Sequence, residues 1–382
     1  MPPISEKQFP IIGGINMPAA TTTFLEPGTD ATQDLSFFRT VTGTVASDAT
    51  VSYTGPRSLK CSVGNPAANT TVLASAGVIA DSGSQVSIYV RFDSLPSATS
   101  VIYTLLTTAL SVAQVQINTS GNLIMAPTGA TAVTGSSVLA INTWYRISVS
   151  YYITNTTTFQ FRLYINGIPE ATASAGTLTR TGTDTIRIGT TSGYGADKNL
   201  WYDNIYAAKG GASSSSQPDT GNILMTAKRP NANGTANNFS TQIGSGGSGY
   251  GLGKSPQVNE QPLSTTNGWS IINAGSVVTE EYNIEDMRTG DVNIRARTIV
   301  SCMGWVYASA LAAETGKIIW NGDKSNISIT TTNTMFMKYS NSRIDAAHEG
   351  EDIGIETDAT VTTVSLYECG VVCAFTRTRT ML

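Results

Sequence analysis

The stretch covering residues 142–206 constrains the fold more than any other part of this chain. Apolar and polar side chains alternate along 144–151 and again along 159–165, which is the period of a strand with one buried and one wet face. Asn166-Gly167 follows the second run directly, and this dipeptide is typical of a two-residue hairpin turn. The stretch therefore predicts successive antiparallel strands. The positions expected on the wet face of the first run are Trp144, Arg146, Ser148 and Ser150.

Three short runs in this stretch carry a family resemblance. WYRI at 144–147, FRLYING at 161–167 and WYDNI at 201–205 resemble, in type and order, the laminin-G-like branch of the concanavalin-type jelly rolls. The resemblance implies a two-sheet β-sandwich over residues 17–208 that acts as a binding or structural module. It also implies that the first sandwich strand, FFRTVTG at 37–43, lies beside the last, WYDNIYA at 201–207.

The rest of the chain predicts a second β domain. Turn-punctuated strands at regular spacing through residues 17–208 favour a sandwich over a βαβ sheet. The Gly/Ser run at 209–219 is the clearest linker, so the 382 residues divide into two domains of ordinary size. Residues 220–382 are predicted to form an antiparallel β-sandwich or barrel, with the long β-branched run 362–375 as a central strand. The fold class is therefore all-β.

Residues 1–16 form a segment in which prolines and a glycine pair discourage regular structure. The apolar side chains of Phe9, Ile11 and Ile12 have no obvious local partners in the sequence. We therefore expect an N-terminal arm that docks on a neighbouring subunit; the alternative is a frayed terminus.

The composition narrows the function classes. Charged residues make up only 13% of the chain and hydrophobic ones 40%, which is typical of β-rich extracellular or virion proteins. A net charge of −4 gives no basic field for nucleic acid, so no nucleic-acid partner is expected. No apolar run approaches the roughly 18 residues of a membrane span, and residues 1–14 lack a secretory signal. Synthesis in a host cytoplasm, without membrane insertion, is the expectation.

The cysteines and the histidine offer little chemistry. Four cysteines are too few and too dispersed for a disulfide framework, and Cys369 and Cys373 would lie about 13 Å apart on one strand face. Buried, reduced thiols are expected. The only histidine, His348, lies in a polar turn without the context of a catalytic triad or a zinc site.

Some concanavalin-type folds are glycanases, which carry paired carboxylates in an E-x-D-x-x-E run. This chain has no such run. In EEYNIED at 280–286, Glu281 and Glu285 would lie about 13 Å apart, too far for a retaining or an inverting pair. A solvated acidic strand edge is the expectation there, and enzyme activity is not expected.

Two kinds of binding residue are predicted at the sandwich rim. Tyr194, Trp201 and Tyr202 are candidates for stacking on a sugar ring, with burial in the core as the alternative for strand aromatics. The laminin-G-like resemblance implies a rim calcium site, for which Asp184, Asp197 and Asp203 are candidates; turn capping is the alternative. No other cofactor is expected.

The second half resembles, in style, phage virion proteins that follow a laminin-G-like domain, through the runs at 230–251, 256–270 and 363–375. This implies a non-enzymatic structural protein on the surface of a tailed-bacteriophage virion. It would act as a capsid decoration or cement protein or head fibre, or as a tail fibre or spike component. Expected partners are major capsid or tail proteins, further copies in a homotrimer, and host glycans. The alternative is a secreted carbohydrate-binding module or glycanase accessory protein.

Overall fold

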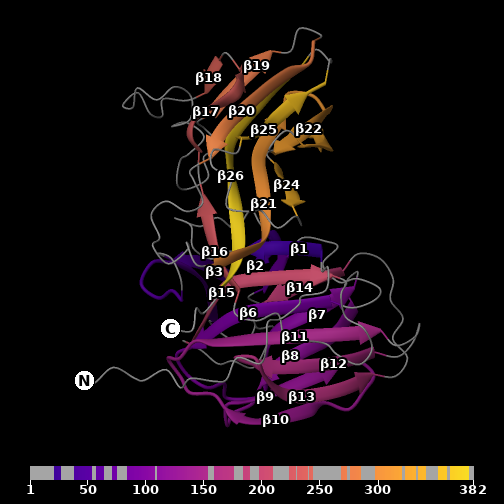
Figure 1. Ribbon diagram of the computed structural model, residues 1–382. Coiled ribbons are helices and arrows are strands. Elements are labelled where there is room, and N and C mark those ends of the chain that lie inside the picture. Colours follow the sequence, from indigo (N-terminus) through magenta and orange to yellow (C-terminus); the bar gives the residue numbers. More distant parts are fainter. Residues whose placement is uncertain are drawn as a thin grey trace.

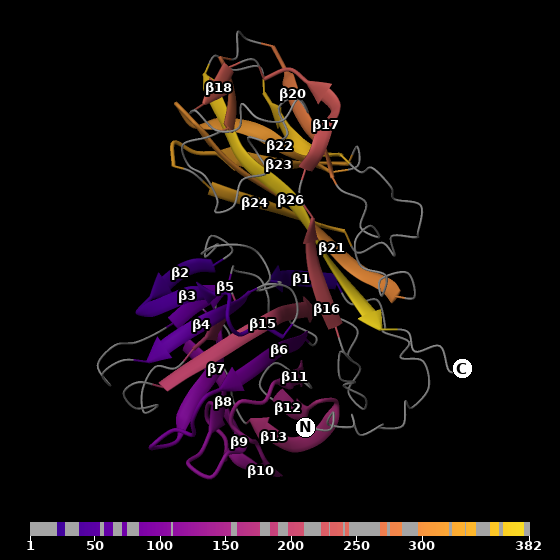
Figure 2. The same cartoon turned by 90° about the vertical axis from the view of Figure 1, so that its left-hand side faces the viewer.

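A computed structural model describes most of the chain from Thr21 to Arg377 (Figures 1 and 2). The described residues are 21–26, 38–53, 57–63, 71–74, 84–107, 110–153, 159–175, 184–189, 198–209, 223–228, 230–239, 241–243, 268–272, 276–284, 297–320, 323–332, 334–340, 352–358 and 362–377. Every regular element among them is a strand, and every strand pair is antiparallel, which confirms the all-β prediction.

The first sandwich has an eight-stranded and a seven-stranded sheet. The larger has the order β13-β12-β11-β6-β15-β4-β3, with β1 also pairing β15. Its strands are β1 (Thr21–Glu26), β3 (Thr44–Asp48), β4 (Ser58–Val63), β6 (Ser84–Phe92), β11 (Tyr145–Ile153), β12 (Phe159–Ile165), β13 (Ile168–Ala175) and β15 (Lys198–Lys209). The smaller has the order β10-β9-β8-β7-β14-β5-β2. Its strands are β2 (Phe38–Thr42), β5 (Thr71–Ala74), β7 (Ser100–Thr107), β8 (Leu110–Ile117), β9 (Asn122–Pro127), β10 (Val133–Val138) and β14 (Asp184–Ile188).

The second pair of sheets has six and five strands, and it forms a sandwich because apolar side chains of both sheets fill one hydrophobic cluster. The larger has the order β18-β19-β26-β21-β24, with β16 pairing β26. Its strands are β16 (Ile223–Lys228), β18 (Thr241–Ile243), β19 (Gly268–Ile272), β21 (Arg297–Ala310), β24 (Thr334–Ser340) and β26 (Thr363–Arg377). The smaller has the order β17-β20-β25-β22-β23. Its strands are β17 (Pro230–Asn237), β20 (Val278–Ile284), β22 (Glu314–Trp320), β23 (Asp323–Ile329) and β25 (Asp352–Thr357). The prediction of a central strand near the C-terminus is confirmed, because β26 lies inside its sheet.

The predicted hairpin at Asn166-Gly167 is also confirmed. Both residues have positive φ angles, 52° and 88°, which is the backbone of a type I′ turn. Asparagine and glycine tolerate this conformation, and the turn brings Ile165 opposite Ile168 in the β12–β13 register.

The expected neighbour of the last sandwich strand is wrong. Residues 38–42 of the run FFRTVTG form β2, which pairs β5 in the seven-stranded sheet. The first half of β15 pairs β4, and its second half pairs β1, so the same side of β15 is shared by two strands. The run TTTFLE at 21–26, rich in β-branched and apolar residues, takes the position expected for FFRTVTG.

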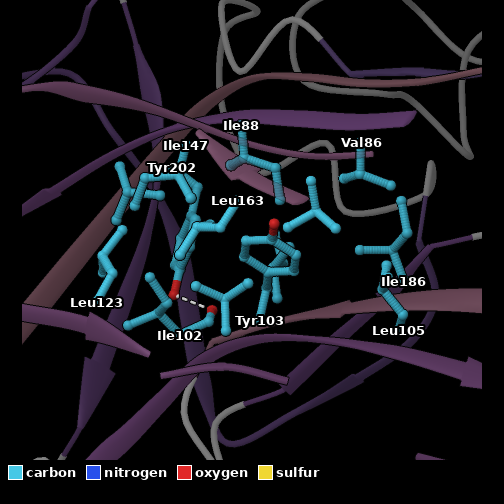
Figure 3. Close-up of a cluster of buried hydrophobic side chains, with 14 of the residues drawn as sticks. Val86, Ile88, Ile102, Tyr103, Leu105, Leu123, Ile147, Leu163, Ile186 and Tyr202 are labelled. Carbon is cyan, nitrogen blue, oxygen red and sulfur yellow. Dashed lines mark hydrogen bonds between the residues drawn. The ribbon is translucent and has the colours of Figure 1, made fainter. Parts of the chain in front are cut away.

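Apolar side chains from both sheets fill the first sandwich (Figure 3). Val86, Ile88, Ile147 and Leu163 come from the eight-stranded sheet and meet residues of β7, β9 and β14. Tyr202 lies among them, and its hydroxyl donates to the carbonyl oxygen of Ile102 at 2.7 Å. A hydrogen bond satisfies this buried hydroxyl, so a tyrosine is tolerated in an apolar core.

The two sandwiches meet at β1 (Figures 1 and 2). This strand contacts β21, β24 and β26, and β15 contacts β16. Trp305 of β21 is 1% exposed and belongs to the hydrophobic cluster of the first sandwich. The second sandwich therefore covers an edge strand that would otherwise be open to pairing.

Of the predicted linker, only Lys209, the end of β15, is among the described residues; residues 1–16, with Phe9, Ile11 and Ile12, lie outside them.

Candidate functional site

The face of the eight-stranded sheet that points away from the core, called here the polar face, is largely buried. Arg146 is 5% exposed, and Ser148 and Ser150 are buried as well, so the expected wet face of this strand is wrong. The Arg146 guanidinium donates to Ser148 Oγ at 3.1 Å, and Ser148 Oγ donates to Ser87 Oγ at 3.1 Å. Hydrogen bonds along β11 and from β11 to β6 serve these groups, which makes their burial tolerable.

Three aromatic side chains gather at one end of this face; we call Tyr53, Tyr89 and Trp144 the aromatic cluster. Tyr89 projects from β6 and is buried, because the Tyr53 ring stacks on it with centroids 3.9 Å apart and planes at 18°. Trp144, half-buried just before β11, lies 6.0 Å from Tyr53 between ring centroids. Tyr53 is 37% exposed, so part of this residue is open to solvent.

A buried carboxylate fixes the position of Tyr53. The backbone N–H of Tyr53 donates to Asp203 Oδ2 at 2.9 Å. Asp203 belongs to β15, where it faces Tyr89 in the register, and it is fully buried. The loop that follows β3 is thereby attached to the sheet at the point where its tyrosine stacks. The aromatic surface is held in place before any ligand arrives.

A row of charged and aromatic residues lies beside the cluster; we call Lys60, Trp201 and Arg91 the cationic row. Trp201 on β15 faces Lys60 of β4 on one side and Arg91 of β6 on the other. The Arg91 guanidinium lies 4.8 Å from the centroid of the indole ring, and the Lys60 ammonium lies 5.5 Å from it. Both distances suit a cation–π interaction. Arg91 also donates to Asn142 Oδ1 at 2.9 Å, which orients its guanidinium.

Asp48 contacts two members of the cationic row, Trp201 and Lys60. Its Oδ2 accepts a hydrogen bond of 2.8 Å from Trp201 Nε1 and lies 4.0 Å from the Lys60 ammonium. Burial alone would raise the pKa of Asp48, but hydrogen bonds from Thr50 and Trp201 and the Lys60 charge together lower the pKa to about 2. Asp48 is therefore ionised at neutral pH.

The predicted stacking residues take other roles. Trp201 is only 5% exposed, because Lys60 and Arg91 lie against its ring, and it supports these cations instead of presenting a face to a sugar. Tyr202 is fully buried in the core, which is the alternative considered for strand aromatics, and we withdraw it from the sugar platform. Tyr194 lies outside the described residues.

The predicted calcium ligands are not brought together by the described part of the chain. Asp184 begins β14 in the seven-stranded sheet, whereas Asp203 lies in the eight-stranded sheet and anchors Tyr53. Asp197 lies outside the described residues, so calcium binding stays a prediction. Within the described ranges, no group of three or more His, Cys, Asp or Glu side chains is placed to hold a metal ion.

The acidic strand of the second sandwich departs from expectation. Residues 280–284 belong to β20, an interior strand between β17 and β25, and Glu280 is fully buried. Its Oε2 accepts a hydrogen bond of 2.6 Å from the Phe239 N–H, so the solvated acidic edge is wrong for this residue. Burial, followed by repulsion from Asp352, raises the pKa of Glu281. Glu285 and His348 lie outside the described residues.

A polar cavity of about 330 Å³ opens on the five-stranded sheet. Glu356 in its wall is held by the Lys317 ammonium, with 2.6 Å between Nζ and Oε1, and by the Lys324 ammonium. Burial would raise the pKa of Glu356, but these two lysines outweigh it and lower the pKa. Because the charges in this wall satisfy one another, we favour the aromatic cluster as the candidate site.

Cys61 and Cys369 are buried and free, as predicted for the thiols of this chain. Burial raises the pKa of the Cys61 thiol to about 12, so it is protonated at neutral pH. The side chain of Cys373 is not among those described. In the described part of the chain, no helix has the length and apolarity needed to cross a membrane.

Sequence reasoning missed Tyr53, Tyr89 and Arg91 as site residues. Tyr53 lies in a turn, in SYTGP, and nothing in the sequence indicates which strand that turn crosses. Trp144 is an aromatic residue at a position that alternation assigns to the polar face of a strand, and this is the sequence signal from which the cluster could have been predicted.

No protein-family model matches this chain, and no curated protein matches it. Among solved structures, it is similar to an endo-β-1,4-glucuronan lyase from the fungus Trichoderma reesei, at 13% identity and a TM-score of 0.40 over 50% of this chain and 96% of that one. It is also similar to domain 4 of AbnA, an extracellular arabinanase from Geobacillus stearothermophilus in complex with arabinotriose. The identity is 14% and the TM-score 0.35, over 51% of this chain and 95% of that one. A third similar structure is a carbohydrate esterase from the Shiga toxin-encoding bacteriophage phi24B, at 13% identity and a TM-score of 0.37 over 48% of this chain and 99% of that one. Likenesses this low carry no argument about activity or ligand.

Proposed function

We propose that this protein is a non-enzymatic structural protein that binds carbohydrate through the aromatic cluster. The observation that carries the proposal is Tyr53, a 37% exposed residue whose ring stacks on Tyr89 with centroids 3.9 Å apart and has Trp144 beside it. An aromatic ring that is supported from one side suits the apolar face of a sugar. Polar groups next to it would then direct the hydroxyl groups.

The neighbours of the cluster support this assignment. Asn142 is exposed and carries an amide that can exchange hydrogen bonds with hydroxyl groups. The Asp203 hydrogen bond and the stack on Tyr89 order Tyr53 in advance. Ordering in advance lowers the entropy lost on binding, which matters for the weak affinity of a single sugar site.

The carboxylates near the cluster favour binding over hydrolysis. A glycosidase needs one carboxylic acid whose pKa is raised, so that it can protonate the leaving oxygen. The pKa of Asp48 is instead lowered to about 2, and Asp203 is covered by the Tyr53 backbone. The Asp48 carboxylate positions Trp201, and the Asp203 carboxylate positions Tyr53.

For the biological setting, we propose the surface of a tailed-bacteriophage particle, with capsid or tail proteins as partners and a homotrimer as the assembly. The charge-poor composition and the all-β architecture support a rigid surface protein. Glycan contact by each copy would be weak and would gain strength through multivalency on the particle. Quantitative mass spectrometry of purified virions is the test. If the virions contain no copies of this protein and a bacterium secretes it instead, the alternative of a secreted carbohydrate-binding module is favoured.

The binding site is tested with Tyr53→Ala and Trp144→Ala in the full chain. We expect each to weaken glycan binding about fivefold, since one aromatic contact contributes about 1 kcal/mol. Tyr367→Ala is the matched control, because this half-buried tyrosine contacts Tyr307 in the second sandwich. The readout is a glycan array followed by calorimetric titration of the best ligand. Unchanged affinity in both cluster variants, with the ligand still bound, would contradict the proposed site.

A further inference from the structure

Arg91 has capacity for a ligand that its own neighbours do not use. Among the described residues its contacts are one hydrogen bond, to the neutral amide oxygen of Asn142, and the face of Trp201. No carboxylate of the described residues pairs with it. A guanidinium carries five N–H donors in a fixed plane, so several donors remain for a ligand.

The cationic row holds this guanidinium in a defined orientation. Lys60, Trp201 and Arg91 occupy directly opposed positions on three neighbouring strands. The Lys60 charge is balanced by Asp48 at 4.0 Å, whereas the Arg91 charge is not balanced within the row. The row is thus locally positive on a chain whose net charge is −4. An anion is the ligand that this arrangement favours.

The cationic row and the aromatic cluster lie within reach of one ligand. Arg91 and Tyr89 are two residues apart on β6 and point to the same face, so their Cα atoms are separated by about 7 Å. Tyr89 itself is covered by the Tyr53 ring, so a sugar residue would place its ring on the Tyr53 and Trp144 part of the cluster and a substituent at Arg91.

We propose that the carbohydrate bound here is an acidic glycan, whose carboxylate is held by the Arg91 guanidinium. The proposal rests on the proposed function, because it names the ligand class of the same surface. A carboxylate matches the planar donors of arginine in a two-point hydrogen bond, which an uncharged hydroxyl group cannot do. Trp201 acts as a positioning residue: it holds Arg91 and does not contact the sugar.

The test compares three oligosaccharides of equal length on the full-length protein: an uncharged one, an oligouronate and a phosphorylated one. The wild type should bind the oligouronate most tightly, and its affinity should fall as salt is raised. Arg91→Gln should weaken oligouronate binding about tenfold or more, and should change binding of the uncharged sugar less than about twofold. Arg91→Lys keeps the charge but loses the planar donors, so it should also lose affinity, by about threefold or more.

Arg162→Gln is the matched control, since it removes one positive charge from β12 of the same sheet without touching the cationic row. An equal loss in Arg162→Gln would mean that bulk charge is responsible, and would overturn the proposal. Equal wild-type binding of the uncharged sugar and the oligouronate would overturn it too, while leaving the glycan function in place. Preference for the phosphorylated sugar would overturn the choice of a carboxylate. Absence of binding to all three would overturn this inference and the proposed function together. Thermal unfolding of each variant checks that it is folded.

Discussion

At Asp48 one carboxylate organises both charge and aromatic packing. It accepts the hydrogen bond of Trp201 Nε1, lies 4.0 Å from Lys60, and thereby holds the ring on which Arg91 lies. The residue has a second, measurable consequence. Its pKa falls from 3.8 to about 2 in the folded protein, so folding favours the ionised form.

Asp48 is therefore expected to make stability depend on pH in a defined window. Because its folded pKa is depressed, the contribution is fully present above the unfolded value of 3.8 and is lost as pH falls toward about 2. The expected size is on the order of 2 kcal/mol. Asp48→Asn should remove this part of the acid sensitivity, measured as the free energy of unfolding in urea between pH 5 and 2.

Asp323→Asn is the control for this experiment, because Asp323 is exposed on β23. It should leave the pH profile close to that of the wild type. A profile for Asp48→Asn that is as steep as the wild-type profile would contradict the assigned role of Asp48.

At the level of the element, the close approach of β20 and β25 depends on a glycine. Gly354 faces Glu281 across the two strands. A Cβ atom at Gly354 would collide with the carbonyl oxygen of Glu280 and lie 2.8 Å from Glu281 Cα. Both obstacles are backbone, which cannot rotate away as a side chain can. Gly354→Ala should therefore cost about 3 kcal/mol or more in the free energy of unfolding.

Gly135→Ala provides the comparison on β10. There the added methyl group would meet the side chain of Glu170, which can move at the cost of its exposed hydrogen bonds to Ser137. The expected loss is about 1 kcal/mol. Chemical denaturation of both variants gives the measurement, and equal losses would show that the β20–β25 spacing is not set by Gly354.

Strands with alternating large apolar residues were predictable, and edge strands were not. The period of two located β11 and β12, and Asn166-Gly167 located the turn that joins β12 to the next strand, β13. The bounds of β13, the strand after that turn, were not predictable, because Ala171 and Ala173 carry its burial and alanine gives little strand signal. The pairing of β1 with β15 was missed because it joins residues about 180 positions apart, and no local pattern encodes such a contact.

The candidate site was less predictable than the fold for the same reason. Alternation placed Arg146 on a polar face, but whether a polar face is wet depends on what covers it. Trp201 was predicted to stack on a sugar ring, but Lys60 and Arg91 lie against its own ring. Tyr53 reaches the site through a backbone hydrogen bond to Asp203, 150 residues away.

On the scale of the whole molecule, Trp305 joins the two sandwiches. It belongs to β21 of the second sandwich, yet it is 1% exposed and packs into the hydrophobic cluster of the first. Tyr307, two residues further along β21, packs against the same cluster.

Trp305→Ala should loosen this junction without unfolding either sandwich. Loss of a buried tryptophan side chain removes about 3–5 kcal/mol of packing, here at the contact between β21 and the first sandwich. The amides of β1, which contacts β21, β24 and β26, should then exchange with deuterium faster than in the wild type.

Trp320→Ala is the control, because Trp320 is buried in the core of the second sandwich. It should speed exchange in β22 and β25 and leave β1 unaffected. Unchanged protection of β1 in Trp305→Ala would show that the two sandwiches are coupled through other contacts.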